Sequence, residues 1–592
     1  MLIDCLWNYI VWIIRNKNYL IIPVVILLFG NSLRSKNEKS TIVPLDPEKP
    51  LPQSREKLRY FKRAAISSDA GDCANIGRDI LLKNGSAVDS AIAGMICNSV
   101  VNSQSAGLGG GFFMTIYSKS ERRVYCLNAR EKAPLGATEE KYAKNKYNSQ
   151  IGALAVGVPG EIKGYKEAHE KFGKLPWNNL IEPVIKLCDE GYIMNYHQYW
   201  SLLKRHPVND ENLQKWFYDD RGNIKKPGER IYPKTLCDFL RALQSNGPDD
   251  FYNGQLSDIF LQDVKDLGGL ITQEDLVNYK VEWQEPVNVT LNNGDVFYSF
   301  PPPGSGAIIA LILNILDGYN FTTENLHESH YHKHIHKLIE TFKFASAQRT
   351  KLGDPNFVDM KQIIEKLLSK KIANSIRHKI DFNINTHYDA RYYEAEYYLN
   401  DDHGTSHVSV IDENGNAVSA TSTINIYFGA GITSKRTGLV LNSVMDDFSY
   451  QYSENYFGLP ISEANRLQPG KRPLSSMAPS ILLNNKGNVK TVIGAAGGPK
   501  IITAISLTLM RILWMGDSLK DAVESPRIHH QLFPMEVHYE YGLISDTVKW
   551  LKSLGHTMER RTESIVYALL KDQNNIIGIV DSRKDGGGVY GL

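Results

Sequence analysis

Two strand-like segments around an Asn-Gly pair constrain the fold of this chain more than any other part of it. Apolar and polar residues alternate over 405–411, and a strand pattern returns over 417–427. Between them, Asn414 and Gly415 form the dipeptide most typical of a tight turn between antiparallel strands. The segment is therefore predicted to be a β-hairpin whose first strand begins at Thr405.

The register of this hairpin determines which side chains lie near Thr405. A two-residue loop pairs Thr405 with Ile424, and a shift of one residue pairs it with Thr423 or Asn425. Either arrangement keeps both polar residues close to Thr405. The preceding residues 389–403 are rich in Tyr, Glu, Asp and Asn and have no clear period, so we expect a mobile segment before the hairpin.

Length and charge indicate an ordinary globular enzyme. The 592 residues can bury a large core, either in one two-layer sheet domain or in two closely joined halves. The formal net charge of +2 lacks the basic excess expected for a nucleic-acid partner, so none is predicted. Globular sequence begins near Tyr60, after a polar, proline-containing tether over 36–57.

The N-terminus carries two apolar runs, 6–14 and 19–30, which Arg15 and Lys17 separate. The second run has the length of a signal-peptide core, whereas the two runs together resemble an imperfect membrane anchor. We favour a signal-anchor and tether over 1–58. This predicts a single-pass type II protein of the cell membrane with its catalytic part outside, and secretion is the alternative.

Cysteines and sequons fit export. One of the six cysteines lies in the apolar segment, and an oxidising compartment permits one or two disulfides among the other five. No CxxC spacing supports a zinc or redox motif. Asn84, Asn288 and Asn320 begin glycosylation sequons, which are consistent with an exported glycoprotein.

A glycine-rich turn over 494–499 lies between a strand pattern and a helix pattern. The amides of Gly497 and Gly498 are predicted to lie at the helix entrance, where they can donate to a developing oxyanion. Pro499 suits the first helical position but excludes a Walker A loop. The earlier glycine-rich turn, 106–111, misses the dinucleotide fingerprint, so no cofactor is predicted.

The hairpin residues resemble the cleavage motif of γ-glutamyltransferases, which matches here at 402–410, DHGTSHVSV, and at 420–425, ATSTIN. The similarity extends over 65–592. It implies an α/β (α+β) N-terminal nucleophile hydrolase fold with four layers, αββα. It also implies self-cleavage between Gly404 and Thr405 into a large subunit, 59–404, and a small catalytic subunit, 405–592, which remain together as a heterodimer.

Self-cleavage has a chemical purpose. A threonine hydroxyl is a poor nucleophile without a nearby base, and the α-amine released at Thr405 can act as that base near neutral pH. Gly404 has no Cβ and tolerates the bent backbone that attack on its carbonyl requires. The resemblance implies that Thr423 orients Thr405 and that Gly497 and Gly498 form the oxyanion hole.

A γ-glutamyl substrate carries an α-carboxylate and an α-ammonium, so its pocket needs both signs of charge. The resemblance assigns the carboxylate to Arg130, Ser475 and Ser476, and the ammonium to Asp447 and Asn425. The family usually has Glu or Gln three residues before Asp447. Val444 stands there and cannot accept a hydrogen bond, so ammonium binding should be weaker by roughly 1.5 to 3 kcal/mol. The resemblance also implies a disulfide between Cys73 and Cys97.

The resemblance implies a glutathione hydrolase and γ-glutamyltransferase that passes γ-glutamyl groups from glutathione and other γ-glutamyl compounds to water, amino acids or dipeptides. An N-terminal nucleophile amidase for other acyl groups is one alternative, but it would not need Arg130, Asp447 and the serine pair together. A weak or inactive paralogue with a structural or binding role is the other, and Val444 is its main support.

A histidine-rich stretch over 327–336 invites a metal-site interpretation, because His332 and His336 are spaced to share a helix face. The HExxH motif is absent, and the stretch continues into the helix pattern of 337–351. A solvated helix start is therefore favoured, and no metal is predicted.

Overall fold

The predicted hairpin lies in the middle of a seven-stranded antiparallel sheet, here called the first sheet. The structure is a computed structural model that describes residues 43–592 apart from 144, 206–209, 320, 322–330, 383, 398–403, 451–460 and 562–563. In spatial order, the strands of the first sheet are β19 (Gly588–Gly591), β2 (Ala65–Ser68), β10 (Ser406–Ile411), β11 (Ala417–Thr423), β3 (Gly111–Ser118), β4 (Arg123–Ala129) and β7 (Glu282–Gln284).

The register of the hairpin is shifted by one residue from the register that a two-residue loop would give. Ser406 faces Ser422, so Thr405 lies opposite Thr423 one step before the ladder begins. The amide of Asp412 donates to the carbonyl oxygen of Asn416 at 3.0 Å, which leaves a three-residue loop. Gly415 has a φ of +81°, the left-handed conformation that such loops require at this position.

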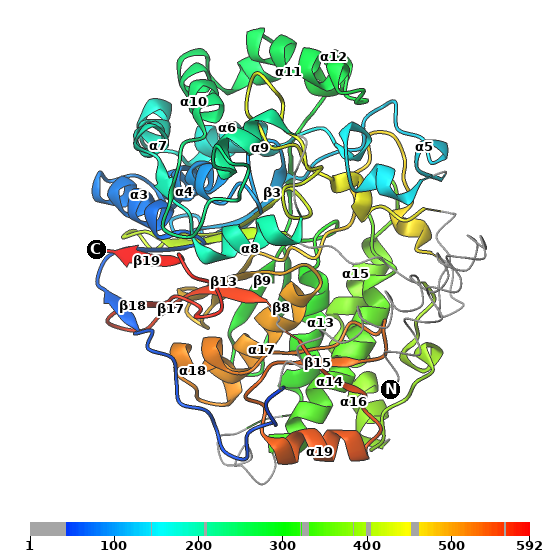
Figure 1. The fold of residues 1–592 in the computed structure, drawn as a ribbon. Helices are drawn as coiled ribbons and strands as arrows, with labels where there is room; N and C mark the ends of the chain where they lie inside the picture. Colours follow the sequence, from blue (N-terminus) through cyan, green and yellow to red (C-terminus); the bar gives the residue numbers. More distant parts are fainter. Residues whose placement is uncertain are drawn as a thin grey trace, which may run out of the picture. The chain divides into compact units, whose positions relative to one another are not determined.

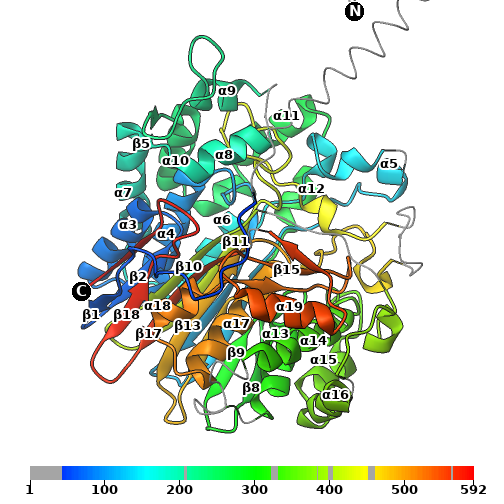
Figure 2. The ribbon, with the colours of Figure 1, turned by 60° about the horizontal axis from the view of Figure 1, so that its bottom comes forward.

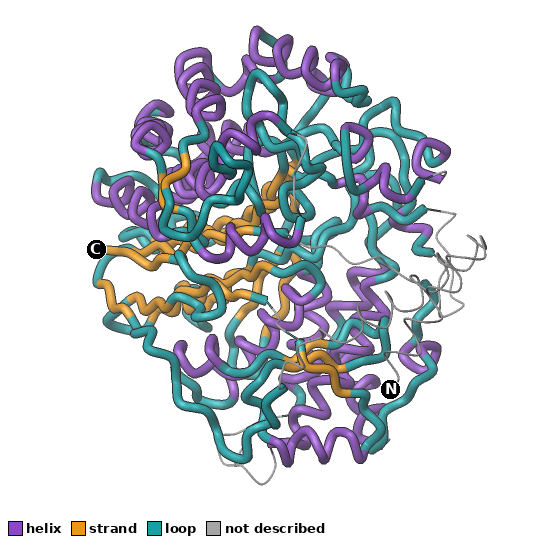
Figure 3. Tube along the Cα trace, in the orientation of Figure 1, coloured by secondary structure: helices purple, strands orange, loops and turns teal. Residues whose placement is uncertain are grey.

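A second seven-stranded sheet packs against the first, and Figure 3 shows the strands gathered between helical layers. Its order is β1 (Arg59–Phe61), β18 (Ile576–Ile579), β17 (Ile565–Lys571), β13 (Val489–Ala496), β12 (Ser480–Leu483), β9 (Val296–Ser299) and β8 (Val287–Thr290). A three-stranded sheet contains β14 (Ile528–His529), β15 (Val537–Tyr539) and β16 (Met558–Arg560). A two-stranded sheet contains β5 (Tyr192–Ile193) and β6 (Arg230–Ile231).

Helices cover the outer face of each sheet (Figures 1 and 2). On the side of the first sheet lie α3 (Gly71–Leu82), α4 (Ala87–Val101), α6 (Glu161–Phe172), α7 (Trp177–Glu190) and α10 (Lys234–Asn246), with α5 (Glu140–Ala143), α8 (Tyr196–Lys204), α9 (Glu211–Phe217), α11 (Gln255–Asp266) and α12 (Gln273–Val277) further out. On the side of the second sheet lie α13 (Gly306–Asp317), α14 (Tyr331–Arg349), α15 (Lys361–Leu368), α16 (Lys370–Phe382), α17 (Lys500–Trp514), α18 (Leu519–Glu524) and α19 (Ser545–Ser553). The predicted four-layer αββα sandwich is confirmed.

Side-chain chemistry changes along the gap between the two sheets. At one end, Ile411 and Val489 belong to a buried apolar cluster that joins the sheets. Towards the other end, His407 replaces the apolar side chains, and its ring lies directly against Gly494 of β13. A Cβ on Gly494 would lie 2.1 Å from Cε1 of His407, so only glycine lets the sheets approach this closely.

The prediction of a mobile segment over 389–403 is wrong where the structure describes it. Ala390–Tyr393 forms a 3-10 helix, and Tyr393 is fully buried. Its hydroxyl donates to Oε2 of Glu340 on α14 at 2.8 Å. Burial of an aromatic ring with a satisfied hydroxyl orders this segment despite its polar composition. Residues 398–403 lie outside the described residues.

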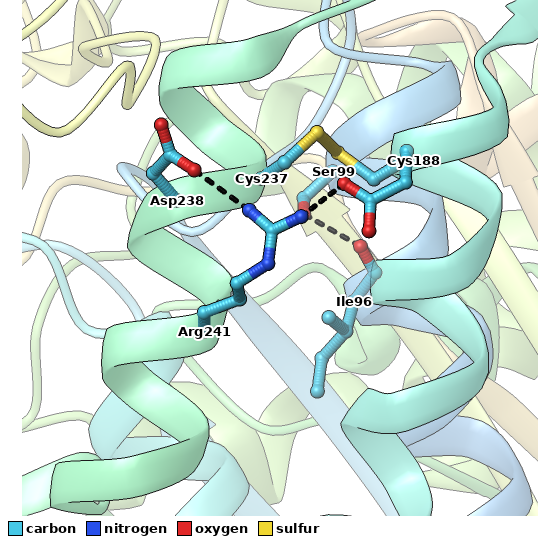
Figure 4. Close-up of a disulfide and its surroundings, with 7 residues drawn as sticks. Ile96, Ser99, Cys188, Cys237, Asp238 and Arg241 are labelled. Atoms are coloured by element: carbon cyan, nitrogen blue, oxygen red, sulfur yellow. Dashed lines mark hydrogen bonds and ion pairs between the residues drawn. A yellow bond between two sulfur atoms is a disulfide. The ribbon is translucent and has the colours of Figure 1, made fainter.

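Two disulfides join helices on the outside of the first sheet. Cys73 of α3 is bonded to Cys97 of α4, as the resemblance implied, and Cys188 of α7 is bonded to Cys237 of α10. Figure 4 shows the second bond above Arg241, whose Nη1 lies 2.7 Å from a carboxylate oxygen of Asp238.

The predicted membrane localisation is contradicted. Among the residues that the structure describes, no helix combines the length and apolar character needed to cross a bilayer. The apolar runs over 6–30 that suggested a single-pass type II anchor lie outside the described residues.

Replacing Gly494 with alanine should destabilise the sandwich by roughly 1–3 kcal/mol, because the new methyl group overlaps the His407 ring. The variant should unfold at a lower temperature in circular dichroism melts. Gly136→Ala is the matched control, since this exposed glycine has only the Leu270 carbonyl oxygen, 3.9 Å away, near its added Cβ. Equal melting temperatures for the two variants would contradict this account of the sheet contact.

Candidate active site

The start of β10 and the end of β13 lie at the same end of the sandwich. His407 contacts Gly494, whereas Ile411 and Val489 meet at the opposite end. Thr405, two residues before His407, therefore lies at the end where β13 leads into the predicted oxyanion turn. Because side chains alternate along a strand, Thr405 shares the gap-facing side of β10 with His407. Thr405 is 7% exposed.

The peptide bond before Thr405 is held by the neighbouring strand. The Thr423 hydroxyl donates to the carbonyl oxygen of Gly404. The backbone amide of Asn425 in turn donates to the hydroxyl oxygen of Thr423 at 2.8 Å. Gly404 has a φ of +113°, and a Cβ there would lie 2.6 Å from the Asn425 carbonyl oxygen. The chain thus requires glycine at this position, with its carbonyl polarised by a hydroxyl donor.

The turn over 497–499 has the geometry predicted for it. Gly497 and Gly498 have φ values of +126° and +62°, and α17 begins directly after Pro499. The two glycines therefore precede the N-terminus of a 15-residue helix, where backbone amides and the helix dipole favour negative charge. Ser564, directly before β17, packs against Gly497.

Arg130 and Asp447, which were assigned to opposite charges of the substrate, contact each other. Arg130 is fully buried at the end of β4; its Nη2 forms an ion pair with Asp447, and its Nη1 lies 3.1 Å from Glu131. Through β3, the strand order places Arg130 two strands from Thr423, about 10 Å away. A buried cation and a buried anion thus lie together at the end of the sheet where Thr405 lies.

Asn425 joins the hairpin to the segment that carries Asp447. Its side-chain amide donates to the Ser443 carbonyl oxygen at 2.8 Å, directly before the 3-10 helix Val444–Asp447. Asn425 itself has a φ of +78°. Val444 is fully buried, and its side chain packs against Gly157, where a Cβ would be 2.3 Å from Cγ1 of Val444. An apolar contact therefore occupies the position where the family usually has an acceptor.

Ser475 and Ser476 are buried beside an arginine that the sequence pattern did not single out. Nη2 of Arg349, at the end of α14, donates to the Ser476 hydroxyl at 2.7 Å, and its Nε donates to Ser305 at 3.3 Å. The Ser475 hydroxyl accepts from the amide of Met477 at 3.2 Å. Arg349 lies in a regular helix pattern, where nothing local distinguishes it from a surface residue.

The histidine interpretation needs correction, because His336 is buried rather than solvated. Among the described residues, His336, Glu340 and His556 form a group that could hold a metal ion. Most of their donor atoms are already engaged, since Nδ1 of His336 and Nε2 of His556 share a hydrogen bond of 2.9 Å and Glu340 accepts from Thr386 and Tyr393. Nε2 of His336 has no hydrogen-bond partner among the described residues. We therefore interpret the group as a buried polar contact between α14 and the turn before β16.

The fold and this constellation define the chain as an N-terminal nucleophile hydrolase. Its structure matches that of cephalosporin acylase from Bacillus halodurans with a TM-score of 0.78 and 25% identity, over 93% of this chain and 99% of the acylase. This similarity reaches across both sheets and both helical layers.

Sequence comparisons identify the family. The family model for gamma-glutamyltranspeptidase matches residues 73–591. Scoloptoxin SSD14 from Scolopendra dehaani is 40% identical over 507 residues, 84% of this chain and 87% of the relative. Glutathione hydrolase proenzyme 1 from Schizosaccharomyces pombe is 37% identical over 536 residues, 88% of this chain and 84% of the relative. The chain belongs to the γ-glutamyltranspeptidase family of enzymes, which confirms the resemblance seen in the sequence.

His407 gives the site a pH-dependent stability. Burial lowers the pKa of His407 to about 3, while its ring nitrogens contact Thr421 at 2.8 Å and Ser409 at 3.0 Å. In the unfolded chain His407 binds a proton near pH 6.5, whereas in the folded chain its ring stays neutral down to about pH 3. The contribution of His407 to folding stability is therefore complete above pH 6.5 and is lost as the pH falls below this value. Between pH 7 and pH 5 the loss should be about 2 kcal/mol.

Urea denaturation at both pH values should show this loss in the wild type and a smaller one in His407→Gln, which has no titrating ring. An equal pH dependence in the two proteins would show that His407 does not contribute it.

Proposed function

We propose that this protein is a self-processing glutathione hydrolase and γ-glutamyltransferase with Thr405 as its nucleophile. The observation that carries the proposal is the ion pair of Arg130 and Asp447, whose side chains are 0% and 5% exposed, at the same end of the sheet as Thr405. A γ-glutamyl group presents a carboxylate and an ammonium on one carbon, so it needs this combination of charges close to a nucleophile. Family membership supports the same activity.

In the proposed self-cleavage, the Thr405 hydroxyl attacks the carbonyl carbon of Gly404. The hydroxyl of Thr423 stabilises the negative charge that develops on the carbonyl oxygen, because it already donates to this atom. The carbon–nitrogen bond then breaks as the nitrogen takes the proton that the hydroxyl gives up, which leaves an ester on the Thr405 oxygen and a free α-amine on Thr405. Water hydrolyses the ester, which releases the Gly404 carboxylate and restores the Thr405 hydroxyl beside the free α-amine.

In the proposed catalytic cycle, this α-amine takes the proton of the Thr405 hydroxyl as it attacks the substrate's γ-carbonyl carbon. The amides of Gly497 and Gly498 stabilise the oxyanion. The amine returns the proton to the departing nitrogen, which for glutathione belongs to cysteinylglycine. A γ-glutamyl ester remains, and water or the amine of an acceptor amino acid or dipeptide resolves it.

Substrate binding would exchange one ion pair for two. The α-carboxylate would take the place of Asp447 beside Arg130, with Ser475 and Ser476 as further donors, while the α-ammonium would bind Asp447. Asn425 would support the ammonium. Because each buried charge regains a partner, entry of the zwitterion leaves no uncompensated ion, which would cost several kcal/mol.

We further propose that the chain consists of a large subunit, 59–404, and a small subunit, 405–592, that stay together after cleavage. β10 would belong to the small subunit, yet it pairs with β2 of the large subunit. β11 pairs with β3 in the same way. Cutting one peptide bond leaves these ladders intact, so the heterodimer needs no new contacts.

Replacing Thr405 with alanine should abolish both cleavage and activity. Intact-mass measurement and N-terminal sequencing should find a fragment beginning at Thr405 in the wild type and only the full chain in Thr405→Ala. Hydrolysis of a γ-glutamyl anilide should be lost as well. Thr405→Ser is the matched control and should still be cut, because it keeps a hydroxyl. A Thr405→Ala protein cut before residue 405 would show that the cleavage is not autocatalytic.

Replacing Arg130 with lysine should lower kcat/KM for glutathione by roughly tenfold to 150-fold, mainly through KM. Lysine keeps the charge but loses the planar two-point contact with a carboxylate. Arg123→Lys is the control, since Arg123 is the first residue of β4, the strand that Arg130 directly follows, and its side chain is 53% exposed. Equal effects of the two substitutions on kcat/KM would contradict the assigned role of Arg130.

A further inference from the structure

Asp69 lies beside Thr405 on the gap-facing side of the first sheet. Val408 of β10 pairs with Ser68 of β2, the last pair of this ladder. The next residue of each strand in this direction is Asp69 on one side and His407 on the other, so Asp69 lies opposite His407. Its side chain reaches Tyr567 on the second sheet, which places it in the gap. Thr405 is two residues before His407 on the same side, and such diagonal neighbours lie about 7–8 Å apart between Cα atoms.

The Asp69 carboxylate has one engaged and one unengaged oxygen. Oδ1 accepts from the Tyr567 hydroxyl and from Nζ of Lys584 at 2.6 Å. Oδ2 accepts no hydrogen bond from any residue that the structure describes, although Asp69 is 0% exposed. A carboxylate oxygen that is buried without a donor is unfavourable, so a group that brings one would be bound strongly.

Cleavage before Thr405 would create such a donor. The amide nitrogen of Thr405 has one proton, whereas the α-ammonium that replaces it has three and a positive charge. Thr405 is 7% exposed, so this new charge needs a partner within the protein. We propose that Asp69 is a positioning residue for the nucleophile, with Oδ2 accepting a hydrogen bond from the α-amine of the processed Thr405. The inference rests on the proposed function.

The charges around this position set the proton affinity of the amine. Burial raises the pKa values of Tyr567 and of Tyr427, the latter to about 12, and Asp69 raises both further, so both phenols stay neutral. Burial lowers the pKa values of His407, to about 3, and of His197, which Lys584 lowers further.

Among the groups named here, Asp69 and Lys584 thus supply opposite charges next to the amine. Asp69 favours the ammonium and holds it in place, and Lys584 opposes it. Together they can keep the amine titrating near neutral pH, where it must act as a base.

The pH dependence of kcat tests this role, because its acidic limb reports protonation of the α-amine. Asp69→Asn keeps the shape but removes the negative charge, so the limb should move to lower pH by about one to three units. Lys584→Met removes the positive charge, so the limb should move to higher pH. Tyr567→Phe is the matched control, since it removes a hydrogen bond to the same carboxylate without changing charge, and its limb should stay in place.

Each variant is made in the full chain, checked for cleavage by intact mass, and assayed by hydrolysis of a γ-glutamyl anilide. A cut, active wild type whose limb does not move in either charge variant, or moves in the same direction in both, would overturn the inference and leave the proposed function standing. An uncut wild type would overturn both. If Asp69→Asn is not cut, the Lys584→Met profile decides, and an unmoved limb overturns the inference.

Discussion

The register of β10 within the first sheet is the constraint on which the candidate site depends. Pairing with β11 places Thr405 opposite Thr423, and pairing with β2 brings Asp69 to the same face. Because neighbouring side chains of a strand point to opposite faces, a slip of one residue would turn Thr405 away from the gap and towards the helices. Hydrogen bonds along the whole hairpin therefore determine the position of a single hydroxyl group.

Buried charges at this end of the sandwich are arranged in ion pairs. Arg130 forms ion pairs with both Asp447 and Glu131, and Asp69 is paired with Lys584. Such pairs contribute little to stability, because removing ions from water opposes their attraction. Well-packed apolar residues like those at the opposite end of the gap would stabilise the fold at least as well. The charges are therefore better explained by chemistry at this end than by folding.

Local patterns in the sequence predicted the parts of the site that are local in the structure. The hairpin and the turn over 497–499 follow from strand and helix periodicity combined with glycine chemistry, and both were found. Contacts between distant residues left no such signal. The resemblance placed Arg130 and Asp447 in one pocket, but their direct ion pair spans 317 positions and that of Asp69 with Lys584 spans 515, so only the assembled sheets show these contacts. The ordered conformation of residues 389–397 likewise depends on a distant partner, Glu340.

The sheet order also fixes the sequence of events that the proposed chemistry requires. Thr405 can attack the preceding carbonyl only when β10 lies between β2 and β11, because the donor on Thr423 and the bend at Gly404 exist only in that arrangement. In the proposed mechanism, folding must therefore precede cleavage. After the proposed cleavage, each sheet would contain strands from both sides of the cut, so neither piece would retain a complete sheet without the other. In the proposed mechanism the cut would complete the site, while the strand ladders formed before the cut would keep the site in position.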